Sequence, residues 1–176
     1  MKAGRASATD IETTERKRWL QRLSVLLTNG NFAVVARVKT SSDPSRAMSR
    51  FGRGRRARTL RAHVRIMEKL ARWTHELYDL CWPNCLQVVL DYVEVRTEEP
   101  CRLTFYTTFL SGLSFVEACG EVPLEERFSS SLALLNLVEE LKVLQASPTR
   151  VKRKAPLLPV MLLIALELLV VNLAAP

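Results

Sequence analysis

Apolar residues recur every three or four positions along most of this chain, which is the spacing of amphipathic helices. The first such segment covers residues 11–27, and its apolar side consists of Trp19, Leu20, Leu23, Leu26 and Leu27. A Thr-Asn-Gly stop signal follows at residues 28–30. We expect this short helix to be only loosely attached to the rest of the protein. Residues 40–55 mix Ser, Pro, Gly and Arg without periodicity, which predicts a flexible basic linker.

A long helix is predicted from about Arg58. At roughly 100° per residue it has one broad apolar face, made of Leu60, Val64, Met67, Leu70, Ala71 and Leu77. The opposite face is basic and consists of Arg58, Arg61, Arg65, Lys69 and Arg72. Trp82-Pro83 interrupts the pattern, because proline cannot continue a helix.

Three more helices are predicted after this interruption. The second helix of this body opens at Pro83 or Asn84 and ends near Pro100, with a buried stripe of Leu86, Val89, Leu90 and Val93. The third runs from Leu103 to Cys119, stops at Gly120, and buries Phe105, Phe109, Leu110, Leu113 and Val116. The fourth covers about 127–144 and buries Leu134, Leu137, Val138, Leu141 and Leu144.

No segment alternates strictly between apolar and polar residues, so the predicted fold class is all-α. We divide the chain into a short helix with a flexible basic linker (1–54), a four-helix domain (55–146), a basic linker (147–156) and an apolar helix (157–176).

Charge separates these segments further. The chain has a formal net charge of +8, and residues 46–72 carry ten basic side chains against one acid, Glu68. Residues 73–145 carry four basic and twelve acidic side chains, so the four-helix body beyond the arginine cluster is acidic. A cluster this rich in arginine favours a polyanionic partner, and nucleic acid is the partner we expect.

The candidate DNA-binding residues lie in this cluster and in the second basic linker. They are Arg53, Arg55, Arg56, Arg58, Arg61, Arg65, Lys69, Arg72, Arg150, Lys152, Arg153 and Lys154. Arginine contacts to phosphate would hold the protein on the backbone without reading the base sequence. Trp73, Trp82 and Phe109 could stack on bases, but their helical spacing among leucines favours the core.

Neither a metal site, a cofactor site nor a catalytic group is predicted. The four cysteines, Cys81, Cys85, Cys101 and Cys119, match no standard zinc spacing, and we expect them as small buried side chains in a reducing compartment. His63 and His75 have no carboxylate, serine or cysteine at a spacing that suggests a relay, so we place them on the helix surface or the edge of the core.

Residues 55–155 carry a series of landmarks in a fixed order. An Arg/Thr-rich entry at 55–59 leads into a helix that ends in Trp73, and Trp82-Pro83 precedes Val-Leu-Asp-Tyr at 89–92. Leu-Ser-Gly-Leu-Ser-Phe follows at 110–115, and Lys-Arg-Lys-Ala closes the region at 152–155. In this order the segment resembles the N-terminal SAM-like core-binding domain of tyrosine recombinases of the phage-integrase type.

The resemblance implies a four-helix domain that forms one half of a clamp on duplex DNA. In that family a separate C-terminal domain supplies a tyrosine nucleophile with its supporting arginines, histidine and lysine. Tyr78, Tyr92 and Tyr106 all lie inside the helical body instead. The chain therefore looks like a recombinase truncated after its first domain, with residues 157–172 resembling the first helix of the missing one, and we expect no transesterase activity.

Two other function classes stay open. Leu157–Leu173 is 17 residues long and follows a basic segment, as in a tail-anchored membrane protein, although Glu167 and Pro159 disfavour a span. The same helix could bind a second copy or a catalytic domain. A helical protein-interaction module that uses the acidic body is the third class. The expected location is intracellular, nuclear in a eukaryote, with the membrane as the alternative.

Overall fold

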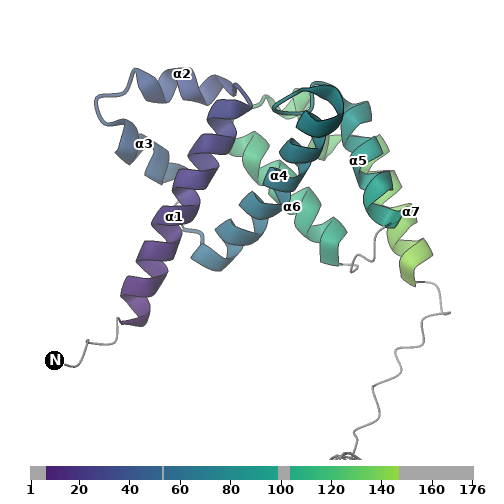
Figure 1. Ribbon diagram of the computed structural model, residues 1–176, viewed down its shortest axis with the longest axis horizontal. Helices are drawn as coiled ribbons and strands as arrows, with labels where there is room; N and C mark the ends of the chain where they lie inside the picture. The colour runs from purple at the N-terminus through teal and green to yellow at the C-terminus, as the bar shows by residue number, and fades with distance from the viewer. Residues whose placement is uncertain (1–6, 53, 99–103, 147–176) are drawn as a thin grey trace, which may run out of the picture. The chain divides into compact units, whose positions relative to one another are not determined.

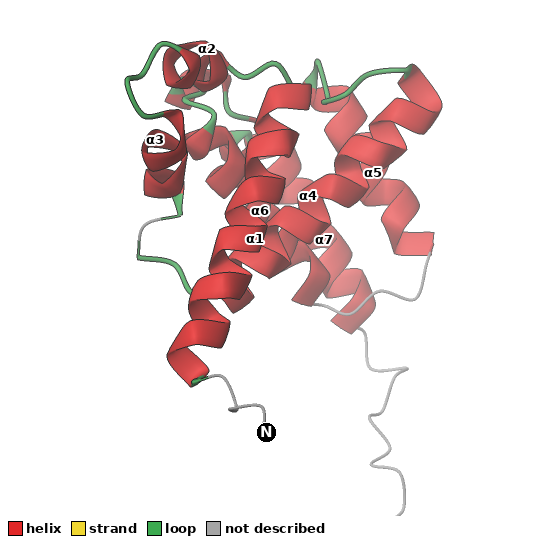
Figure 2. Ribbon diagram, turned by 60° about the vertical axis from the view of Figure 1, so that its left-hand side comes forward, coloured by secondary structure: helices red, strands yellow, loops and turns green. Residues whose placement is uncertain are grey.

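A computed structural model of the chain describes residues 7–52, 54–98 and 104–146. The chain divides into two units, Met1–Gln145 and Ala146–Pro176. Every regular element in the described residues is helical, as Figure 2 shows, so the all-α prediction is confirmed for this part of the chain. No helix among the described residues is long and apolar enough to cross a membrane. The apolar segment 157–173 and the basic linker before it lie outside the described residues.

Seven α-helices make up the described part of the chain (Figure 1), joined by short connections. They are α1 (Ala8–Asn29), α2 (Ala33–Lys39), α3 (Pro44–Phe51), α4 (Ala57–Tyr78), α5 (Leu86–Glu98), α6 (Thr104–Cys119) and α7 (Leu132–Ala146). Two 3₁₀ turns, η1 (Leu124–Glu126) and η2 (Phe128–Ser130), stand between α6 and α7.

Helix α4 is the centre of the first unit, because it packs against α1 on one side and α6 on the other. Leu60, Val64, Met67 and Leu70 on α4 are fully buried. Close approach to α6 depends on Gly112, where an added Cβ would lie 2.9 Å from Ile66 Cγ2 and 3.4 Å from the His63 carbonyl oxygen. The long apolar face expected for this helix is therefore its core face, except at Leu77, which is 61% exposed near the end of the helix.

The prediction that the first helix is loosely attached is wrong. Helix α1 packs along α4, and Trp19, Leu23 and Leu27 are buried in the same hydrophobic core as α4. The helix is also longer than expected, because Ser7 and Asp10 form a capping box in which each side chain accepts the backbone amide of the other residue. Residues 8–29 belong to the same unit as the four predicted helices.

Residues 40–55, expected to be a flexible linker, contain helix α3. The Asp43 side chain accepts a hydrogen bond from the Arg46 amide, and Pro44 occupies the first helical turn, where its missing N–H costs nothing. Met48 and Phe51 pack against the core, and an added Cβ at Gly52 would lie 2.4 Å from Leu20 Cδ2. The sequence pattern did not predict helix α2 either. Both helices lie beside α1 (Figure 1).

The fourth predicted helix starts later than expected, at Leu132 instead of Arg127. The reason is Glu117 on α6, whose carboxylate accepts hydrogen bonds from the backbone amides of Phe128 and Ser129 and holds this segment in a 3₁₀ turn. Burial raises the pKa of Glu117, while these hydrogen bonds, those from Ser129 first, act in the opposite direction. At the other end of α7, Leu144 is 63% exposed, so its expected burial is wrong.

The aromatic side chains predicted for the core belong to it. Phe109 is fully buried, and Trp73 and Trp82 are partly buried against the core. The Trp73 ring meets Tyr92 edge-on at a centroid distance of 5.3 Å, and Trp82 meets Phe32 in the same way at 5.2 Å. These contacts fix the connection between α4 and α5 to the rest of the core.

The structure predicts that α1 carries a large share of the stability. Replacing the fully buried Leu23 by alanine leaves a cavity between α1 and α4 and should lower the free energy of unfolding by about 2–5 kcal/mol. Val25→Ala is the matched control on the same helix, because Val25 is 59% exposed, and it should change that free energy by less than about 0.5 kcal/mol. Urea unfolding followed by circular dichroism measures both, and equal effects would contradict an integral α1.

Candidate nucleic-acid interface

Five basic side chains follow one line along α4, and we call them the cationic face of α4. They are Arg58, Arg61, Arg65, Lys69 and Arg72, and all five are exposed. Their spacing of three and four residues keeps them on one side of the helix over about 21 Å. None of them forms an ion pair with another described residue. The structure thus brings together the stripe that the sequence predicts.

The one acid within this stretch, Glu68, is neutralised by α1. Arg22 makes a two-pronged contact with it, with Nε 2.7 Å from Oε1 and Nη2 2.6 Å from Oε2. A parallel pair of hydrogen bonds between a guanidinium and a carboxylate is among the stronger side-chain contacts. Because both carboxylate oxygens of Glu68 accept hydrogen bonds from Arg22, Glu68 does not form ion pairs with the cations on either side of it along α4.

The Trp19 ring, at the contact between α1 and α4, lies against three arginine side chains. The guanidinium of Arg22 lies 4.7 Å from the ring centroid, that of Arg65 lies 5.3 Å away and that of Arg18 lies 5.9 Å away. Trp19 itself is only 2% exposed, and its Nε1 donates a hydrogen bond to Glu15. Cation–π contacts of this kind restrict the side chain without using its N–H donors, which in Arg22 donate to Glu68.

A groove of about 500 Å³ runs beside the cationic face, between α4, the end of α5 and the start of α6. Arg65, Lys69 and Arg72 lie on its α4 wall. Arg96 from α5 lies on the other wall, with its guanidinium 5.5 Å from the ring centroid of Phe105. A hollow with cations on both walls concentrates positive potential, which attracts anions more strongly than a flat surface does.

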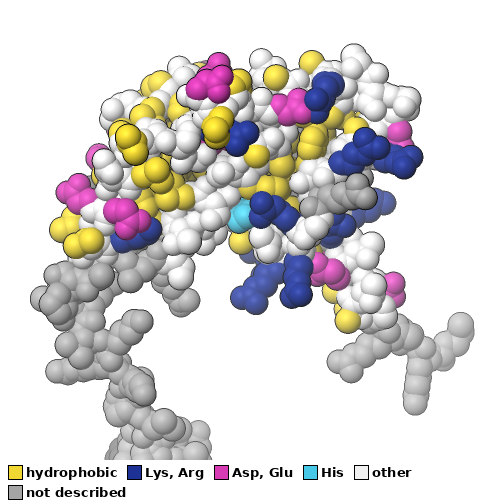
Figure 3. Space-filling view, turned by 180° about the vertical axis from the view of Figure 1, so that it is seen from behind, with side chains coloured by type: hydrophobic (Ala, Val, Ile, Leu, Met, Phe, Trp, Pro, Cys, Tyr) yellow, Lys and Arg dark blue, Asp and Glu magenta, His cyan; other side chains and the backbone are white. Residues whose placement is uncertain are grey.

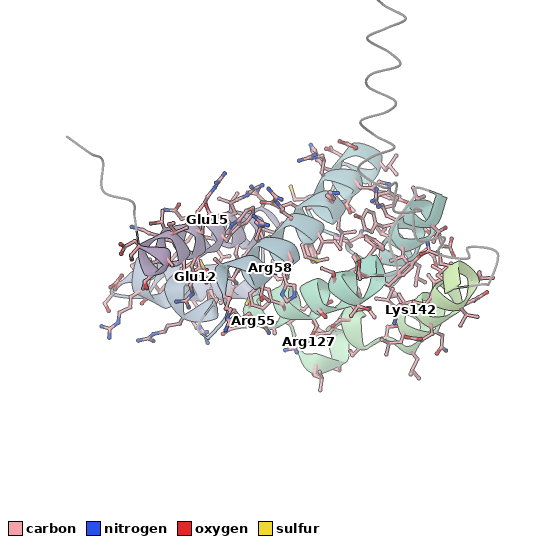
Figure 4. All side chains as sticks on the ribbon, turned by 90° about the horizontal axis from the view of Figure 1, so that it is seen from below. Glu12, Glu15, Arg55, Arg58, Arg127 and Lys142 are labelled. Atoms are coloured by element: carbon pink, nitrogen blue, oxygen red, sulfur yellow. The ribbon has the colours of Figure 1, made fainter. Side chains whose placement is uncertain are left out.

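The cationic face continues beyond the start of α4 through Arg55 and Arg56, which are both exposed. Arg56 is the N-cap residue of α4 and makes no side-chain capping bond. The cap comes from α1, where Glu12 Oε1 accepts the Ala57 amide at 2.6 Å. The guanidinium of Arg55 lies over the Phe115 ring at 4.7 Å. Figure 4 labels Glu12, Arg55 and Arg58 around this point.

Basic side chains also gather over the N-terminal helices. In Figure 3, which views the molecule from behind, most dark-blue side chains lie towards the side of α1 to α3. One of these cations is already engaged, because Arg37 on α2 forms an ion pair with Glu121. Of the predicted DNA-binding residues, Arg53, Arg150, Lys152, Arg153 and Lys154 lie outside the described residues.

The two histidines have different surroundings. His75 is exposed and lies 3.5 Å from Asp79, Nδ1 to Oδ1. His63 is buried between α4 and α6, against the Phe115 ring, and its Nδ1 has no hydrogen-bond partner among the described residues. Burial, and then the charge of Arg55, lowers the pKa of His63 below 6.5.

The cysteines differ in exposure. Cys119 is buried as predicted, and burial raises the pKa of its thiol to about 12, so it is not a ready nucleophile. Cys81 and Cys85 are exposed, which corrects the prediction that they are buried: in the connection between α4 and α5 it is Trp82, between them, that packs against the core. Cys101 lies outside the described residues. Within residues 7–52, 54–98 and 104–146, no group of three His, Cys, Asp or Glu side chains could hold a metal ion.

Comparison of the chain with protein-family models, with curated proteins and with solved structures finds no match. The case for a function therefore depends on the surface itself.

The burial of His63 predicts a pH dependence of stability. Since its pKa in the folded state is below 6.5, the unfolded chain binds more protons just below that pH, and stability should fall as the pH drops through this range. Urea unfolding of the wild type and of His63→Leu at about pH 7.5 and about pH 5.5 tests this, because the variant should lose less stability between the two. His75→Gln is the control, and an equal loss in His63→Leu and the wild type would contradict the assignment.

Proposed function

We propose that this chain binds nucleic acid, with double-stranded DNA as its partner, through contacts between phosphates and the cationic face of α4. The observation that carries the proposal is the line of five exposed cations, none paired with a described acid, on one rigid helix. Duplex DNA presents a phosphate charge about every 1.7 Å of its axis, so a cationic line of about 21 Å meets many phosphates at once.

The surface suits binding to the backbone better than reading bases. Phosphate contacts position a protein on DNA, whereas sequence is read by donors and acceptors that reach the base edges. Four of the five cations on α4 are arginines, which pair with phosphate in a two-pronged geometry. Trp19 and Arg22 add support from α1, so the interface extends over two helices. We therefore propose salt-dependent binding with little sequence preference.

A non-catalytic role fits the positions of the tyrosines. Tyr92 and Tyr106 are buried, at 1% and 0% exposure, and cannot reach a phosphodiester on the surface. Tyr78 is exposed, but its hydroxyl contacts Asp91, and its pKa is raised by partial desolvation and by that carboxylate. A raised pKa makes a phenol a weaker source of the phenolate nucleophile. These positions support the proposal that the described helices bind DNA without cutting it.

The resemblance to the core-binding domain of tyrosine recombinases enters the same proposal. Helices α4 to α7 lie where the apolar pattern predicts four helices, although α4 continues past Trp73 to Tyr78, and α4 carries the cations. Helix α1 is an addition to that pattern, since it covers one side of α4 and neutralises Glu68. In the proposed arrangement α1 and α4 together form the DNA-facing surface of a SAM-like domain.

Salt dependence tests this proposal directly. If five cations each meet one phosphate, the slope of log Kobs against log salt concentration should be about −4.5, since each contact contributes about −0.9. Removing one exposed cation, by Arg61→Gln or Arg72→Gln, should reduce the steepness of the slope by about 0.9 each. Fluorescence anisotropy with labelled duplexes of two unrelated sequences, over a salt series, measures these slopes.

Lys142→Gln is the matched control, because it removes one positive charge from α7, which Figure 4 labels away from Arg58. Its slope should equal that of the wild type. Equal slopes for Lys142→Gln, Arg61→Gln and Arg72→Gln would mean that net charge, and not the cationic face of α4, governs binding. Circular dichroism of each variant verifies that the helices remain folded.

A further inference from the structure

A second hollow, larger than the first, lies on the other side of α1. It has a volume of about 970 Å³ and is lined by α1, α2, α3 and the segment before α4. Its α1 wall is one continuous side of the helix, from Glu12 to Thr28, which is about 24 Å long. Val35, Val38 and Met48 supply the facing wall. None of the five cations on α4 lines this groove, so a ligand here would share only Arg55 and Arg56 with the proposed nucleic-acid surface.

Charge is concentrated at one end of the groove. The end near the start of α4 is lined by Arg16, Lys17, Arg55 and Arg56, with Glu12 as the single acid. One oxygen of Glu12 is already used, because it accepts the Ala57 amide. This end therefore has an excess of positive charge, and its cations converge from α1 and from the segment before α4.

The other part of the groove is mainly apolar. Leu20 and Val25 from α1 face the α2–α3 side, where the apolar lining consists of Val35, Val38 and Met48. Val35 and Val38 are largely buried and Val25 is 59% exposed, so the apolar lining reaches from the core to the surface. Among the described residues, Lys39 is the one cation that lines this apolar part of the groove. The groove thus has a charged end followed by an apolar channel.

Arg16 is held in place at the wall of the groove. Its Nη2 donates to the Gly52 carbonyl oxygen at 2.7 Å, which fixes the guanidinium there. Its Nε is buried and has no acceptor among the described residues, so this atom is not exposed to a ligand in the groove. The side chain still lines the groove, and its positive charge adds to that of Lys17, Arg55 and Arg56 at this end.

We propose that this groove binds a single-chain anionic amphiphile, namely a long acyl chain with a terminal carboxylate. The carboxylate lies at the charged end of the groove, which is lined by Arg16, Lys17, Arg55 and Arg56 and therefore complements its negative charge. The acyl chain lies along the apolar lining between α1 and α2. An acidic amphipathic helix fits less well, because its carboxylates are distributed along its length, whereas the cations here are concentrated at one end.

Calorimetric titration of the full chain with dodecanoate, kept below its micelle concentration, tests the proposal. We expect saturation at one molecule per chain. Dodecan-1-ol has the same chain length and no charge. It should bind at least about tenfold more weakly than dodecanoate, because it lacks the charge-assisted hydrogen bonds to the cations at this end. Equal binding of the two compounds, or no saturation with dodecanoate, would overturn the proposal.

Variants separate the two parts of the groove. Ser24→Trp places a large ring in the apolar part and should abolish dodecanoate binding, whereas Thr14→Trp, on an exposed position of α1 outside the groove, should leave it unchanged. Arg16→Gln should weaken dodecanoate about tenfold and dodecan-1-ol little. If Arg16→Gln does not fold because the Gly52 contact is lost, Lys17→Gln, an exposed side chain, should weaken dodecanoate in the same direction.

Two outcomes would assign the groove to something else. Binding of dodecanoate that Ser24→Trp leaves intact would show adsorption elsewhere on the protein. Sedimentation with vesicles of anionic phospholipid, without any binding of monomeric dodecanoate, would show a membrane-surface contact instead of a ligand groove. Ser24→Trp should leave the salt dependence of DNA binding unchanged, because it touches none of the cations on α4.

Discussion

Burial of α4 between α1 and α6 is the constraint on which the rest of this structure depends. Once Leu60, Val64 and Met67 face inward, the geometry of the helix leaves one side for solvent, and from Arg58 to Arg72 that side carries a line of cations. Packing against α1 also brings Arg22 to Glu68 and Trp19 beneath Arg65. The same contact that stabilises the core therefore aligns the charges on the surface and removes the one acid among them.

The long helices could be predicted from the sequence, because apolar periodicity over three or more turns leaves little choice of face. Helices α2 and α3 could not, since each has only about two turns, and residues 40–55 are dominated by polar and small side chains. A signal for α3 was present in Asp43-Pro44, a capping residue followed by a proline in the first turn. Leu77 and Leu144 lie near helix ends, where periodicity continues but no neighbouring helix covers the side chain.

The stripe of arginines on α4 could likewise be predicted, because it depends on spacing within one helix. The contacts that residues on other helices make with α4 and with one another could not be predicted. Arg22 and Glu68 are 46 positions apart, Glu12 and Ala57 are 45 apart, and Glu117 meets Phe128 from 11 positions away. Such contacts depend on which helices become neighbours, and a charge pattern read along the chain contains no information about that.

The start of α4 has an electrostatic cost. A helix N-terminus carries partial positive charge and favours acids in its first turn, yet α4 has none of its own there and begins with Arg56 and Arg58. The Glu12 carboxylate from α1 offsets part of this unfavourable charge, because it accepts the Ala57 amide. In the proposed complex, a phosphate beside Arg56 and Arg58 would reduce the repulsion between these arginines and the helix N-terminus. The folded protein should therefore be more stable with nucleic acid bound than alone.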